Sequence, residues 1–206
     1  MINEPDAKRL LVQNLNFDNQ KLTKLEYFVK KLLIYNKKRN LIAKSTEKNV
    51  WVRHILDSAQ LVKFIDVKNC SGIADLGSGG GFPGIILALF FQDYNFHVKL
   101  YEKSPLKSAF LLKISKKLDL NCNVICSDVN SQKIESNHII CRAFRKLPYI
   151  LNISRENCVK KHKIIILKGK NAQEEINNTS QMKNYEYRLE KSITDNDSKI
   201  IIMNAE

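Results

Sequence analysis

The stretch Ile73-Ala74-Asp75-Leu76-Gly77-Ser78-Gly79-Gly80-Gly81-Phe82-Pro83-Gly84 decides the fold of this 206-residue chain. Six of the seven glycines lie at positions 72, 77, 79, 80, 81 and 84, which indicates that one local backbone feature requires glycine. Residues 72–76 predict a short strand, and Pro83 suits the first turn of a helix over residues 83–91. A strand that passes through a glycine-rich turn into a helix is where doubly wound α/β folds bind nucleotide-like ligands.

The chain after this loop alternates between strand and helix patterns. The pattern predicts strands at residues 97–101, 123–126, 137–141 and 163–167, and helices at residues 106–118, 147–158 and 172–180. Two last strands, near 185–191 and 199–203, have no helix between them, which favours an antiparallel edge. The alternation predicts a doubly wound, mostly parallel sheet that is covered by helices on both faces.

The chain before the loop has helical periodicity only. One apolar stripe consists of Leu22, Leu25, Phe28, Val29, Leu32 and Leu33. A second helix is predicted over residues 50–63, with Ser45, Thr46 or Asn49 as candidate caps near its start. Residues 1–65 are therefore expected to form a helical extension, and residues 66–206 an α/β domain, together one compact unit.

The charges around the loop favour one ligand over another. The glycine spacing of residues 79–84 does not match a dinucleotide loop, which disfavours a dehydrogenase. Asp75, two residues before Gly77, suits the ammonium group of S-adenosylmethionine, with Ser78 and Gly79 beside the ligand. Glu102, at the end of the second strand, can accept hydrogen bonds from both ribose hydroxyls. The sequence thus predicts a methyltransferase site that includes no metal.

Composition restricts the partners and the compartment. A formal net charge of +13 attracts polyanions such as RNA, although a generally lysine-rich surface has the same composition. The five cysteines form no CxxC pair, so we expect reduced thiols in the cytoplasm rather than disulfides or a zinc site. The first eleven residues lack the apolar core of a signal peptide, and the longest apolar run, residues 85–91, is too short to span a bilayer. We expect a monomer.

Several separated segments resemble one protein family. They are Asn40-Leu41-Ile42-Ala43, Val52-Arg53-His54-Ile55-Leu56-Asp57-Ser58, Asp75 through Gly84, Glu102-Lys103-Ser104 with Lys107, Arg142-Ala143-Phe144 and Leu167-Lys168-Gly169. Together they resemble the RsmG (GidB) family, bacterial methyltransferases with a Rossmann-like fold that methylate a guanine at N7 in the 16S rRNA of the small ribosomal subunit. Glycine loops occur in many methyltransferases, whereas the segments around His54 and Ala143 are much more specific.

The resemblance also implies roles for individual residues. It places Gly77 and Phe82 against the cofactor, Glu102 on its ribose, and Val129 and Asn130 beside its adenine. Family members tend to have an acidic residue at the position of Asn130. The resemblance places Arg142, at the end of the fourth strand, where methyl transfer occurs.

The predicted chemistry requires few catalytic groups. Guanine N7 has an exposed lone pair and no proton, so its methylation needs alignment with the sulfonium methyl and no general base. The sequence contains no Asn-Pro-Pro-Tyr segment for exocyclic amines and no Pro-Cys nucleophile. Arg142 is the candidate catalytic residue, through the guanine carbonyl oxygen, a phosphate or the cofactor carboxylate; a structural salt bridge is the alternative. The candidate RNA contacts are Lys37, Lys38, Arg39, Arg53, His54, Arg145 and Lys168.

Two alternatives remain open from the residues alone. One is a methyltransferase of the same fold that acts on a protein or a small molecule. The other is a non-enzymatic RNA-binding module on a decayed methyltransferase fold, against which the complete loop, Glu102 and Arg142 all argue.

Overall fold

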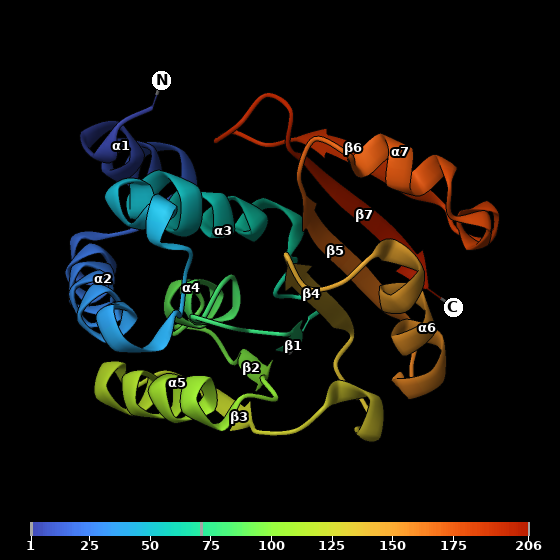
Figure 1. Ribbon diagram of the computed structural model, residues 1–206, viewed down its shortest axis with the longest axis horizontal. Coiled ribbons are helices and arrows are strands. Elements are labelled where there is room, and N and C mark those ends of the chain that lie inside the picture. Colours follow the sequence, from blue (N-terminus) through green and yellow to red (C-terminus); the bar gives the residue numbers. More distant parts are fainter. Residues whose placement is uncertain (1, 71, 206) are drawn as a thin grey trace.

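The computed structural model describes residues 2–70 and 72–205. The strand that enters the glycine loop, β1 (Gly72–Leu76), lies between β2 and β4 in the interior of a seven-stranded sheet (Figure 1). The strand order is β3-β2-β1-β4-β5-β7-β6. The other strands are β2 (His97–Tyr101), β3 (Cys122–Ile125), β4 (His138–Arg142), β5 (His162–Lys168), β6 (Tyr187–Lys191) and β7 (Lys199–Ala205). The first five strands are parallel, and β7 runs antiparallel to both β5 and β6. This confirms the predicted doubly wound sheet and its antiparallel edge.

Helices cover both faces because the strands are apolar on both sides. Alternate residues of β5 belong to different cores: Ile165 and Leu167 face one side, and Ile164 and Ile166 the other. The first core includes α4 (Gly84–Phe90) and α5 (Pro105–Leu118), and the second includes α6 (Leu147–Asn157) and α7 (Ala172–Asn177). Most predicted boundaries are right to within two residues, but the helix predicted over 172–180 ends at Asn177.

The N-terminal part is helical, as predicted, and packs into the first core. It contains α1 (Glu4–Leu15), α2 (Asn19–Arg39), the 3-10 turn η1 (Lys44–Asn49), the π-helical turn η2 (Trp51–Leu56), α3 (Asp57–Ala59) and the 3-10 turn η3 (Gln60–Phe64). Leu11, Phe28 and Ile55 share one continuous core with the sheet residues Ile73 and Leu100, so the extension is part of the same packed unit. No helix in the described ranges is long and apolar enough to cross a membrane.

The predicted helix over residues 50–63 has the right extent but not the regular geometry. It consists of a π turn, one α turn and a 3-10 turn in succession. The cap prediction was wrong, because Val50 stands at the N-cap of η2 with no side-chain hydrogen bond. Thr46 instead donates from Oγ1 to the carbonyl of Ala43, 2.7 Å away, and the same oxygen contacts Nε2 of His54.

The junction between β1 and α4 is held by a buried carboxyl group. Asp75 is fully buried, and its Oδ2 accepts a hydrogen bond of 3.0 Å from the backbone N–H of Gly84. Burial raises the pKa of Asp75 to about 7. A Cβ on Gly84 would overlap the side chain of Leu100 and would lie 2.5 Å from Asp75 Oδ2. Glycine is therefore required here to bring the start of α4 against the sheet.

We predict that Gly84→Ala lowers the free energy of unfolding by about 1–3 kcal/mol, because the added methyl group has no space. Gly169→Ala is the matched control, since a Cβ at Gly169 has no heavy atom within 4 Å. The unfolding free energy of Gly169→Ala should differ from that of the parent by no more than about 0.5 kcal/mol. Urea denaturation measures both values, and equal stability of the two variants would contradict the packing argument.

We predict that Asp75→Asn changes how stability depends on pH. The pKa of Asp75 is about 7 in the folded protein, against about 3.9 in an unfolded chain. The stability contributed by the protonated carboxyl is therefore complete below about pH 4 and is lost as the pH rises through about 7. As the pH rises from about 4 to about 7, the unfolding free energy of the parent should therefore fall by up to about 4 kcal/mol relative to that of the variant. Urea denaturation at a series of pH values tests this; a constant difference would show that Asp75 stays ionised in the folded protein.

Candidate active site

A cavity of about 430 Å³ opens at the carboxyl ends of β1, β2 and β4. It lies where the strand order reverses, with β2 and β3 on one side of β1 and β4 and β5 on the other. This is the usual ligand position in doubly wound folds. Its lining includes the loop residues Gly77, Ser78, Gly79 and Phe82, the strand ends Glu102 and Arg142, and Leu41, His54, Lys107, Asp128, Val129, Phe144, Arg145 and Tyr149. The predicted cofactor residues thus lie together, with the exceptions of Asp75 and Asn130.

The glycine loop is held with its backbone toward this cavity. The N–H groups of Gly77 and Ser78 both donate to the carbonyl of Tyr101, at 2.9 and 3.0 Å. Gly77 and Gly79 have φ values of 71° and 55°, a backbone conformation that residues other than glycine rarely adopt. The ring of Phe144 occupies the position that a Cβ on Gly77 would need, so Phe144 packs on the loop.

Glu102 is a buried acceptor beside the loop. Its Oε2 accepts from the N–H of Gly79 and its Oε1 from the N–H of Ser104, both at 2.8 Å. A carboxylate oxygen accepts about two hydrogen bonds, so each oxygen has one position left. This geometry suits a pair of neighbouring hydroxyls.

The residues after β3 differ in part from the prediction. Val129 is buried and lines the cavity. Asn130 is outside the cavity lining, and its Nδ2 donates to Asp128 Oδ1 at 2.9 Å and to the hydroxyl of Tyr149 at 2.5 Å. The polar side chain that lines the cavity here is that of Asp128. Sequence reasoning missed it, because Asp128 and Asn130 stand on either side of Val129 and only the geometry of the turn decides which of them faces the cavity.

Asp75 also takes a different place from the one predicted. Its carboxyl group lies beneath the loop and is absent from the cavity lining. From there its Oδ2 positions the backbone of the loop through Gly84, while its Oδ1 is buried without a hydrogen-bond partner.

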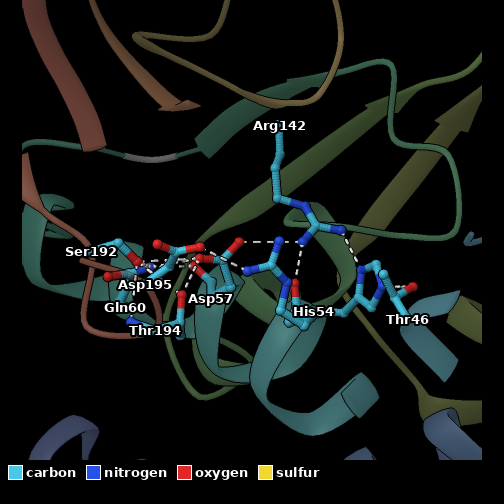
Figure 2. A network of polar contacts seen from close by, with 9 residues as sticks. Thr46, His54, Asp57, Gln60, Arg142, Ser192, Thr194 and Asp195 are labelled. Atoms are coloured by element: carbon cyan, nitrogen blue, oxygen red, sulfur yellow. Dashed lines mark hydrogen bonds and ion pairs between the residues drawn. The ribbon is translucent and has the colours of Figure 1, made fainter. Parts of the chain in front are cut away.

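Arg142 stands at the end of β4 in a network of polar contacts, shown in Figure 2. Its Nη2 contacts Nδ1 of His54 at 2.6 Å, and its Nη1 donates to the carbonyl of Arg53 at 2.7 Å and to Oδ2 of Asp57 at 3.3 Å. The guanidinium lies 5.1 Å from the centre of the Phe82 ring. These contacts fix a largely desolvated cation beside Phe82 of the loop.

His54 is a neutral acceptor in this network. Burial, with the nearby charges of Arg142 and Arg53, lowers the pKa of His54 to about 3. Since Nδ1 accepts from Arg142, the ring proton is on Nε2, which contacts Oγ1 of Thr46 at 2.7 Å. His54 therefore positions Arg142 and carries no charge of its own.

Asp57 connects Arg142 to the loop between β6 and β7. Its Oδ1 accepts from Oγ1 of Thr194 at 2.8 Å and from Nε2 of Gln60 at 3.0 Å (Figure 2). Arg53 pairs with Asp195 of this loop at 2.9 Å. Sequence reasoning missed the 192–195 loop, because this polar segment contains no recognisable motif.

A second cavity of about 290 Å³ lies on the other side of Arg142. It shares His54, Arg142 and Ala143 with the first cavity, and also contains Asp57, Leu167, Gly169 and Thr194. Ala143 has a φ of 49°, an uncommon conformation for a residue other than glycine. Arg142 and Ala143 thus form a wall that separates two adjoining cavities.

The predicted RNA contacts are spread over a wide area. Arg145 lines the first cavity and lies on the Tyr149 ring, while Lys168 lines the second and pairs with Glu175 at 2.7 Å. The exposed residues Lys37, Lys38 and Arg39 end α2, outside both cavities.

Two further observations concern nucleophilic and metal-assisted chemistry. Cys141 is fully buried, and burial raises its pKa to about 12, so its thiol is not a nucleophile at neutral pH. The described residues contain no cluster of His, Cys, Asp or Glu that could hold a metal ion.

Comparison with known proteins agrees with this geometry. The model of the GidB family, described as rRNA small subunit methyltransferase G, matches residues 21–201. Ribosomal RNA small subunit methyltransferase G of Pelagibacter ubique is 37% identical over 93% of this chain and 92% of that protein. The protein of the same name from Rickettsia felis is 38% identical over 87% of this chain and 91% of that protein.

Solved structures share the fold at low sequence identity. A SAM dependent methyltransferase from Aquifex aeolicus has a TM-score of 0.55 and 14% identity, over 85% of this chain and 97% of that chain. Aeropyrum pernix fibrillarin with natively bound S-adenosyl-L-methionine has a TM-score of 0.54 and 15% identity, over 74% and 75%. The fold is thus Rossmann-like, and the family match, at a much higher identity, goes further: this chain belongs to the GidB family of S-adenosylmethionine-dependent rRNA small subunit methyltransferases.

Proposed function

We propose that this protein transfers the methyl group of S-adenosylmethionine to N7 of a guanine in 16S rRNA, as a monomer in the cytoplasm and without a metal. The observation that carries the proposal is the position of Arg142, fixed between two adjoining cavities. One cavity fits the cofactor, and the other is open to the methyl acceptor.

The first cavity fits S-adenosylmethionine through its donors and acceptors. Glu102 would bind the ribose hydroxyls with its two remaining acceptor positions. Val129 supplies an apolar surface for the adenine, and Asp128, whose Oδ1 is engaged by Asn130, would accept from the adenine amine with Oδ2. An adenine contact by Asn130 itself stays a prediction: its Nδ2 donates to Asp128 and to Tyr149, so its amide oxygen would have to accept from the adenine amine. When bound, the cofactor supplies an electrophilic methyl group on a sulfonium.

The second cavity provides the acceptor position. Guanine N7 needs no proton removed, which agrees with a site that contains a neutral His54 held by Arg142 and Thr46. Arg142 lies where its guanidinium would contact the guanine O6 next to N7, a common arginine contact. Its contacts with His54, Arg53 and Asp57 would hold it in place during transfer.

The direct test is methyl transfer from labelled cofactor to small ribosomal subunits, with the modified base mapped. Label at N7 of one guanine supports the proposal. Label in protein, or in no macromolecule while the cofactor binds, would contradict it.

We predict that Arg142→Lys reduces methyl transfer at least tenfold, about 1.4 kcal/mol of transition-state stabilisation. A single ammonium does not reproduce the planar fork that meets His54, Arg53 and Asp57. Single-turnover kinetics measures the effect. Arg188→Lys is the matched control, an exposed residue on β6 that should keep the parent's rate. A parental rate in Arg142→Lys would show that the arginine only contributes charge.

We predict that Glu102→Gln lowers the affinity for S-adenosylmethionine at least tenfold, about 1.4 kcal/mol. The amide has one oxygen, so it loses one acceptor for the N–H groups of Gly79 and Ser104 and the charge for the ribose. Titration calorimetry measures the change. Glu156→Gln, an exposed substitution on α6, should bind as the parent does, and equal binding by both variants would place the ribose elsewhere.

A further inference from the structure

The positive charge of this protein is concentrated on two neighbouring helices. Of the 34 lysines and arginines, α2 carries seven and α5 carries four, whereas the two helices together contain one carboxylate, Glu26. The two helices thus hold +10 of the net +13. The rest of the chain has almost as many acidic as basic side chains, so the charge is a local feature.

Most of these cations are available at the surface. Lys21 is buried against Asp18 and Asp93, and Lys24 bonds to Gln92 and to the carbonyl of Leu118. The exposed members are Lys30, Lys37, Lys38 and Arg39 on α2 and Lys113, Lys116 and Lys117 on α5. None of these seven forms an ion pair with a carboxylate in the described part of the chain.

The two helices run antiparallel and enclose an apolar groove. Tyr35 packs on Phe110 with ring centres 5.1 Å apart, while Lys24 reaches the far end of α5 at Leu118. The groove has a volume of about 440 Å³ and is lined by Tyr27, Lys31, Tyr35, Phe110, Lys113 and Lys117, among others. Lys31 lies 5.3 Å from the ring centre of Tyr27, and Lys113 lies 5.6 Å from that of Tyr35. The groove therefore combines aromatic faces with ammonium groups.

The groove leads toward the active site. Lys107, on the first turn of α5, lines the cofactor cavity, and so do Leu41 and Ile42, just after α2. Because the helices are antiparallel, the basic end of α2 at Lys37–Arg39 lies at this same end of the groove. Cations thus extend from the cavity along both helices.

We propose that the groove between α2 and α5 binds the rRNA strand that flanks the methylated nucleotide. This rests on the proposed function and adds the position of the substrate. RNA matches the groove in charge and in chemistry: the lysines contact phosphates, and a base or ribose packs on the tyrosine faces. A purely acidic protein segment would use the lysines but not the aromatic floor.

The test is the salt dependence of binding to a small-subunit rRNA transcript. Replacing Lys113, Lys116 and Lys117 together with Gln should make the slope of log affinity against log salt shallower by about 2, since each single-strand phosphate contact contributes about 0.7. Replacing Lys160, Lys183 and Lys191 with Gln removes the same charge near the opposite edge of the sheet, and should leave the slope unchanged. Equal slopes for the two triple variants would overturn the proposal.

A second variant tests the apolar floor. Tyr27→Leu should lower the affinity for the transcript about fivefold or more, as expected for a lost base stack, and should leave the salt slope unchanged. Thermal unfolding and S-adenosylmethionine titration establish that the variant is folded. Unchanged affinity in a folded variant, or competition by polyglutamate as strong as by RNA at equal charge, would show that the groove is not an RNA site.

Steady-state methylation separates this proposal from the proposed function. The α5 triple variant should raise the KM for rRNA and keep the parent's kcat and cofactor affinity. A parent protein that does not methylate rRNA would refute the proposed function, while the binding slopes would still decide the groove. A parent that methylates rRNA, with an unchanged KM in the triple variant, would refute the groove alone.

Discussion

The burial of the Arg142 charge is the constraint on which the rest of the site depends. Its side chain is 16% exposed, and a desolvated guanidinium is tolerated only when its donors are satisfied. β4 supplies no acceptor of its own. The acceptors come from the helical segment before the sheet, through His54, Asp57 and the carbonyl of Arg53, and Asp57 is held in turn by Thr194. The N-terminal extension is therefore an integral part of the site.

This requirement also gives a reason for the irregular helix between residues 50 and 64. In η2 the turn is wider than in an α-helix, a feature that is often found at functional sites. Here His54 and Asp57 meet the same guanidinium on different nitrogens, and the freed carbonyl of Arg53 accepts a third bond. The ring of Phe82, on the glycine loop, packs against both the guanidinium of Arg142 and the ring of His54.

The sequence was sufficient for features that are coded locally. Hydrophobic periodicity predicted the sheet, and the glycine cluster with Glu102 and Arg142 predicted where the strands end in a cavity. It was insufficient where side chains far apart in the chain meet, as for Asp57 with Thr194. It did not predict how the side chains of Asn130 and Asp75 are oriented, because the orientation of a side chain in a turn depends on its hydrogen bonds and not on its position in a motif.

The order of the last two strands has a consequence for synthesis of the protein. β7 lies between β5 and β6, although β6 precedes it in the chain. During translation, the edge of β5 stays open and β6 has no neighbour until residues 199–205 have left the ribosome. The loop that holds Asp57 lies between these strands, so a nascent chain can form the glycine loop and the contacts of Arg142 with His54 and Arg53 before Thr194 can hold Asp57. The support of Asp57 by Thr194 is therefore among the last contacts of the site to form.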